Sequence, residues 1–124
     1  RVYDTSNSRI FRDNSNLVEE LFIDSRGQMW IACAEQIVVG TFTRSGDFSI
    51  RRIIPLSGTT GAATITEDDE GNIWFGLQSG LFRIRGGAPE GGLESICTAN
   101  VPKIYRLASG KMLFSIYGSG LFEI

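Results

Sequence analysis

Short apolar runs separated by polar, glycine-containing turns make up most of this sequence, and no segment keeps the 3.6-residue period of an amphipathic helix. The densest run, Ile73–Leu77, is apolar on both faces and predicts a strand that is covered on both sides. Leu81–Arg85 alternates more, and wetter segments follow at 48–53 and 93–97. The pattern therefore predicts units of four short strands, graded from buried to exposed.

One motif recurs along the chain. LFIDSRGQMWIAC at 21–33 and ITEDDEGNIWFGL at 65–77 both place an Asp three residues before a Gly and a Trp three residues after it. The third copy, YRLASGKMLFSIY at 105–117, keeps the glycine and the apolar run but has Leu107 and Leu113 in place of the Asp and the Trp. A glycine suits the positive φ that such a turn can require, so we expect a tight turn in each copy.

A second element supports the same repeat. SGLF occurs at 79–82 and again at 119–122, whereas the first copy has AEQIVVGTF at 34–42. The repeats are about 40 residues long, and four antiparallel strands repeated at this length are typical of propeller blades. We therefore predict an all-β fold: a β-propeller of about three four-stranded antiparallel blades. A β-sandwich also has many short strands, but it does not need the same turn and aromatic run at this spacing.

The expected blade repeats cover approximately 1–40, 41–84 and 85–124 of one partial propeller at 1–124. GLFEI at the end of the sequence aligns with GLFRI at 80–84, and the first residues are interpreted as the end of a third strand followed by a fourth. Propellers typically close with four to eight blades. We therefore expect an excerpt of a longer array, or copies that assemble to complete a ring.

The second copy carries the pattern most fully. Its residues are Asp68, Gly71, Ile73, Trp74, Phe75, Gly76, Gly80, Leu81 and Phe82. This pattern resembles the two-component regulator propeller repeat of hybrid two-component histidine kinases. The first copy has Ala32 where Gly76 stands and lacks the Gly-Leu-aromatic element, while the third copy matches the second half well.

The resemblance implies a periplasmic sensor region of an inner-membrane protein that responds to glycan fragments. The implied partners are an oligosaccharide ligand, further blades and a second copy of a homodimeric parent, whose kinase would lie outside this sequence. Two alternatives stay open: a protein-interaction scaffold, and part of a propeller-fold polysaccharide lyase or glycosidase, because propellers host many functions.

The composition limits the binding partners and catalytic groups that this segment can have. Twelve Lys and Arg against 14 Asp and Glu give a net charge of -2, which offers no electrostatic case for nucleic acid or anionic membranes. Histidine is absent, which removes Ser-His and Cys-His catalysis and His-containing metal sites from this segment. Cys33 and Cys97 are interpreted as two small buried thiols, with a single disulfide as the alternative.

Some residues invite a functional interpretation. Asp68, Asp69 and Glu70 resemble a cation site, but the other copies lack the spaced oxygen ligands that Ca²⁺ loops need, so we expect a solvated turn. Trp30 and Trp74 could stack on sugar rings, but their place inside apolar runs predicts a core between blades.

Carboxylate pairs occur at Glu19–Glu20 and at Glu67 with Asp68, yet the sequence marks neither as catalytic. The loops at 86–92 and 4–8 are expected at the surface, where binding is often located. We predict no enzyme activity, no cofactor and no metal for this segment, and the sequence assigns no ligand-binding position.

Overall fold

The structure is a computed structural model that describes residues 18–56 and 63–124, and its strands form three antiparallel sheets. The first sheet has the order β1 (Val18–Ile23), β2 (Met29–Cys33), β3 (Gln36–Phe42) and β4 (Phe48–Pro55). The second has the order β5 (Thr64–Glu67), β6 (Ile73–Leu77), β7 (Gly80–Ile84) and β8 (Glu94–Cys97). The third has the order β9 (Ile104–Arg106), β10 (Met112–Ile116) and β11 (Gly120–Glu123).

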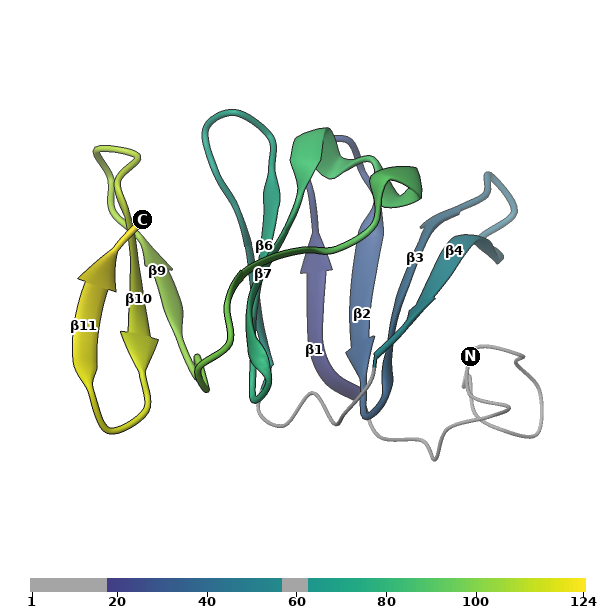
Figure 1. The fold of residues 1–124 in the computed structure, drawn as a ribbon. Coiled ribbons are helices and arrows are strands. Elements are labelled where there is room, and N and C mark those ends of the chain that lie inside the picture. Colours follow the sequence, from purple (N-terminus) through teal and green to yellow (C-terminus); the bar gives the residue numbers. More distant parts are fainter. Residues whose placement is uncertain (1–17, 57–62) are drawn as a thin grey trace.

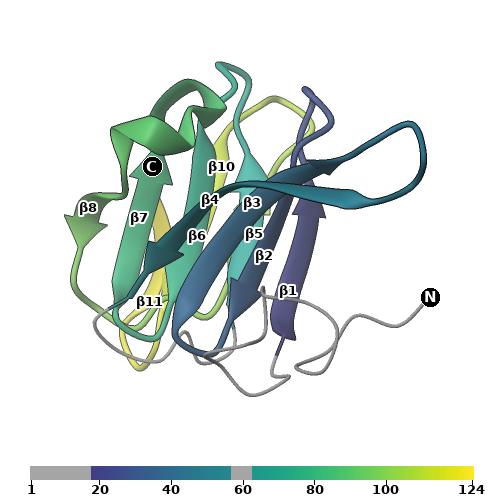
Figure 2. The ribbon, with the colours of Figure 1, turned by 90° about the vertical axis from the view of Figure 1, so that its right-hand side faces the viewer.

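The sheets stand beside one another in chain order (Figure 1), and the view turned by 90° shows them stacked face to face (Figure 2). The first strands of the sheets contact each other, β1 with β5 and β5 with β9. In each sheet the chain runs from this inner strand outward through antiparallel neighbours. The inner strands are therefore adjacent along one side of the stack, as the blades of a propeller require.

The expected division at residues 40 and 84 differs from the division into sheets. β3 passes residue 40 and pairs with β4, and β8 lies beyond residue 84 but pairs with β7. Backbone pairing therefore groups residues 18–55, 64–97 and 104–123, because the more exposed strands β4 and β8 each pair with the strand that precedes them in sequence. The third sheet has three described strands instead of the expected four. The strands expected in the first residues lie outside the described part.

Two apolar cores hold the stack together. Between the first and second sheets, Trp30 packs edge-on against Phe75 with ring centroids 5.7 Å apart. Between the second and third sheets, Trp74 packs with Leu81, Met112 and others. Trp30 is fully buried and Trp74 is 3% exposed, so both indoles lie in the cores between blades, as the sequence predicts, and neither ring face is available to a ligand.

The two cysteines remain thiols in the structure, Cys33 buried on the outer face of the first sheet and Cys97 half-buried on β8. The disulfide alternative is therefore not what the fold adopts. Within the described ranges no helix has the length and apolar character to span a bilayer.

Candidate functional site

A turn built around a buried carboxylate joins β1 to β2. Asp24 Oδ1 accepts hydrogen bonds from the backbone N–H groups of Arg26 and Gln28, each at 2.9 Å. Asp24 Oδ2 accepts from Gln28 Nε2 and from Trp30 Nε1, again at 2.9 Å. Gly27 supplies a φ of 82° that other residues rarely adopt. The Asp, the Gly and the Trp of the motif thus meet in one local structure.

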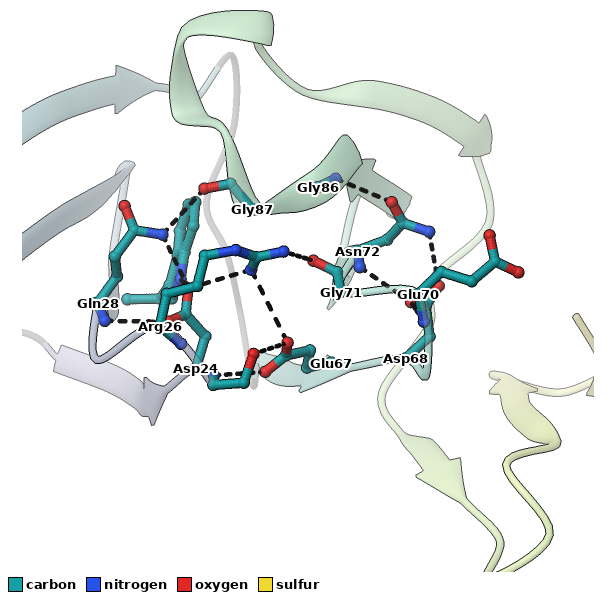
Figure 3. Close-up of polar contacts among 12 residues, drawn as sticks. Asp24, Arg26, Gln28, Glu67, Asp68, Glu70, Gly71, Asn72, Gly86 and Gly87 are labelled. Carbon is teal, nitrogen blue, oxygen red and sulfur yellow. Dashed lines mark hydrogen bonds and ion pairs between the residues drawn. The ribbon is translucent and has the colours of Figure 1, made fainter.

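The same construction recurs between β5 and β6. Asp68 Oδ1 accepts from the backbone N–H groups of Glu70 and Asn72, and Oδ2 accepts from Asn72 Nδ2 at 2.9 Å and Trp74 Nε1 at 2.8 Å. Figure 3 shows Asp24 with Gln28 in the first turn and Asp68 with Asn72 in the second. Both oxygens of Asp68 serve protein donors, so this carboxylate shapes the turn. In the part of the chain that the structure describes, no group of three or more Cys, Asp and Glu side chains is placed to hold a metal ion.

Both turn carboxylates are held in the charged form. Burial raises the pKa of Asp24 and of Asp68, but hydrogen bonds from the Trp indole, the amide side chain and the backbone outweigh it, so each pKa lies below its ordinary value. Neither group is therefore suited to donate a proton as a general acid near neutral pH.

The third turn shows that the backbone fold does not require the carboxylate. Leu107 N–H donates to Lys111 O at 2.8 Å and Gly110 N–H donates to Leu107 O at 2.9 Å, which repeats the backbone bonds of the other two turns. Gly110 has a φ of 89°. The glycine is thus the shared requirement, and the Asp–Trp bond is an addition in the first two copies.

Polar contacts at these turns connect each sheet to the next. Ser25 N–H and Oγ donate to the Glu67 carboxylate at 2.7 and 2.5 Å. Arg26 Nη2 donates to Gly71 O at 3.0 Å (Figure 3). Between the second and third sheets, Arg106 forms an ion pair with Asp69. We call Ser25–Glu67 and Asp69–Arg106 the turn-end pairs.

The two turn-end pairs use equivalent positions of the repeat, but the donor and the acceptor exchange sheets. The turns begin at Asp24, Asp68 and Leu107. In both pairs, the residue that follows this position in one sheet contacts the residue that precedes it in the next sheet. The side chain on the earlier sheet is the donor in Ser25–Glu67 and the acceptor in Asp69–Arg106. Sequence reasoning missed these pairs. They could have been found by comparing the residue after the motif Asp in one copy with the residue before the equivalent position in the next copy, and asking whether one is a donor and the other an acceptor.

The loop at 86–92 connects sheets as well. It contains two short 3-10 turns, η2 (Arg85–Gly87), which contacts β6 of the second sheet, and η3 (Pro89–Gly91), which contacts β4 of the first sheet. Gln28 Nε2 donates to Gly87 O at 2.9 Å, and Arg51 makes a bidentate pair with Glu90 at 2.8 and 2.9 Å. This segment, expected as a surface loop, therefore fastens the second sheet to the first. The other expected loop, 4–8, lies outside the described residues.

Two polar grooves flank the β5–β6 turn. One, of about 460 Å³, lies between the second and third sheets, and its walls include Glu70, Arg83, Lys111 and Glu123. The other, of about 350 Å³, lies on the side of the inner strands and is lined by both turn-end pairs. Lys111 pairs with Glu123 at 3.1 Å. The grooves thus present charged donors and acceptors, which suits hydrogen bonding to a polar ligand.

Two other carboxylates that the sequence singled out are Glu67 and Glu20, and each accepts a hydrogen bond within the described residues. Glu67 is engaged by Ser25, and Glu20 accepts a hydrogen bond from the backbone of Leu21 on β1. Glu94 binds Arg83 and Arg85 on one side of the second sheet. Asp68 therefore serves a turn, and Glu67 serves a contact between the first and second sheets.

Comparison with known proteins identifies the fold. Neither a protein-family model nor a curated protein sequence matches this chain. Among solved structures, the extracellular domain of a B. thetaiotaomicron protein assigned as a one-component system is similar, with a TM-score of 0.65 and 19% identity. The match covers 98% of this chain and 19% of that one.

Two further solved structures are similar to this chain in fold. The extracellular domain of a B. thetaiotaomicron protein assigned as a hybrid two-component system matches with a TM-score of 0.57 and 13% identity over 84% of this chain and 14% of that one. Virginiamycin B lyase from Staphylococcus aureus, a catalytically inactive H270A variant with quinupristin, matches with a TM-score of 0.57 and 22% identity over 86% of this chain and 40% of the lyase. The chain thus spans less than half of each of these three structures, and its fold is that of β-propeller blades.

Proposed function

We propose that this chain is a non-enzymatic, ligand-binding segment of an extracytoplasmic sensor propeller in a hybrid two-component signalling protein. The observation that carries the proposal is the repeated Asp-x-x-Gly-x-x-Trp turn followed by Gly-Leu-aromatic, which resembles two-component regulator propeller repeats. The fold is similar to extracellular domains of proteins assigned as one-component and hybrid two-component systems, which supports the same assignment.

The proposed ligand is a glycan fragment met in the periplasm. Hydroxyl-rich ligands need both donors and acceptors, and the groove between the second and third sheets offers Glu70, Lys111 and Glu123. Because the tryptophans are buried, recognition by this segment would rest on hydrogen bonds and not on indole stacking. Glu70 is the clearest candidate contact, since its backbone N–H serves the turn while its side chain is exposed.

An enzyme related to the lyase is a weaker candidate. The lyase variant that is described as inactive has its histidine 270 replaced, and this chain contains no histidine that could supply such a group. A scaffold for protein interaction would use exposed apolar side chains such as Tyr105 and Leu121 on the third sheet.

The test is a panel of neutral and acidic oligosaccharides scanned by thermal shift on the complete sensor region. A ligand that binds the folded state raises its melting temperature by mass action. We expect a shift with at least one glycan, reduced by Glu70→Gln in the groove and unchanged by Glu19→Gln on β1. Folded protein that shifts with no glycan in a broad panel would contradict the proposal, and release of product from a polysaccharide would favour the enzyme.

A further inference from the structure

The groove between the second and third sheets carries an excess of negative charge. Its walls hold four carboxylates and two cations, which are Asp68, Asp69, Glu70, Glu123, Arg83 and Lys111. Four negative and two positive side chains give this groove a net charge of -2, as large as that of the whole chain. Because a groove concentrates the field of the charges that line it, this place favours a cationic ligand.

The excess charge belongs to Asp68 and Glu70. The other charged side chains of the groove already form ion pairs, which are Asp69–Arg106, Lys111–Glu123 and Arg83–Glu94. Within the described residues, neither Asp68 nor Glu70 has an ion-pair partner. Asp68 accepts only from neutral donors. Glu70 is exposed, and its carboxylate points away from the turn (Figure 3).

The first copy of the repeat shows the same turn with a cation in place. Arg26 stands at the position of Glu70, two residues after the turn carboxylate. Its guanidinium reaches from the first sheet to the second, where it donates to Gly71 O at 3.0 Å, and it lies 3.9 Å from Asp24 Oδ2. The carboxylate of Asp24 is thus accompanied by a positive charge between the sheets. Asp68 makes the same hydrogen bonds, but the cation is replaced by a second carboxylate.

From this comparison we propose that the groove binds an ammonium group, carried by a glycan of unacetylated amino sugars. The inference rests on the proposed function, since it takes the ligand to be a glycan. Glu70 accepts a hydrogen bond from the ammonium. Asp68, whose oxygens already serve four donors, contributes its charge from a longer distance, as Asp24 does in the first copy. Ser109 and Lys111 of the third sheet are left for the sugar hydroxyls.

Two matched sugars test the proposal by calorimetric titration of the complete sensor region. One is a glucosamine tetrasaccharide and the other is its N-acetylated form, and the pH is one at which the free amine is protonated. A hydrogen bond to a charged group predicts that the glucosamine form binds at least about tenfold more tightly. Glu70→Gln should remove this preference, whereas Glu19→Gln on β1, outside the groove, should keep it.

A second variant supplies the missing cation from the chain itself. Glu70→Arg gives the second copy the residue of the first and is expected to abolish binding of the glucosamine form, with circular dichroism showing that the variant is folded. Equal binding of the N-acetylated form, a preference that survives Glu70→Gln, or a trilysine peptide that binds as tightly as the amino sugar would each overturn the inference.

The proposed function is judged separately. If the amino sugar fails but a neutral or acidic glycan still raises the melting temperature, the sensor function stands and only the ligand class is wrong. If no glycan of either kind binds the folded protein, both are contradicted.

Discussion

The buried turn carboxylate gives the sharpest stability prediction. Asp24→Ala removes the acceptor of four hydrogen bonds, from the backbone of Arg26 and Gln28, from Gln28 Nε2 and from Trp30 Nε1. Gln28 Nε2 keeps a second acceptor in Gly87 O. The Gln28 backbone N–H and the Trp30 indole N–H lose the acceptor described here while remaining in a buried site.

The magnitude follows from those two donors. A buried donor that loses its partner costs about 1–3 kcal/mol, so the free energy of unfolding should fall by about 2–6 kcal/mol. The equivalent Asp68→Ala removes the same number of bonds, but Asp68 and Asn72 are only half-buried, so water can replace the carboxylate. We expect a loss of about 1–2 kcal/mol there, as for an exposed capping residue.

Urea unfolding followed by tryptophan fluorescence measures both variants, at one fixed protein concentration because an oligomer's stability depends on it. Equal losses in Asp24→Ala and Asp68→Ala, or a loss below 1 kcal/mol in the first, would refute the argument from burial. The pH dependence adds a check. Since the pKa of Asp24 in the folded protein lies below the ordinary 3.8, its stabilisation is present above that pH and lost as the pH falls further, so the gap between wild type and Asp24→Ala should shrink in acid.

Three other predictions concern single positions. Gly76→Ala places a Cβ within 2.6 Å of a carbonyl oxygen in the connector before β9 and should destabilise the fold by about 1–3 kcal/mol in thermal melts; an unchanged melting temperature would contradict this. Hydrogen bonds from Arg85 and then Arg83 lower the pKa of Glu94 to about 2, so the midpoint of an NMR titration should move toward 4.5 in Arg85→Gln, and an unchanged midpoint would contradict the Arg85–Glu94 pair. Burial raises the pKa of Cys33 to about 11, so a thiol reagent should modify Cys97 first and Cys33 only on unfolding.

The local structure could be predicted from the sequence because its causes are local. Gly71 permits the positive φ of the turn, and the run Ile73–Leu77, apolar on both faces, requires cover on both sides of the sheet. Repetition of these features at intervals of about 40 residues predicts stacked blades and places Trp30 and Trp74 in the cores between them.

Only the tertiary structure shows which residues of different sheets contact each other. The sequence alone does not show that Ser25 binds Glu67 or that Arg106 binds Asp69, because each pair joins different sheets and forms only once the sheets are stacked. It also does not show that Gly87 and Glu90, in a loop expected at the surface, fasten the second sheet to the first. Local turns follow from backbone sterics and hydrogen bonds within a few residues, whereas these contacts follow from the stacking of the sheets.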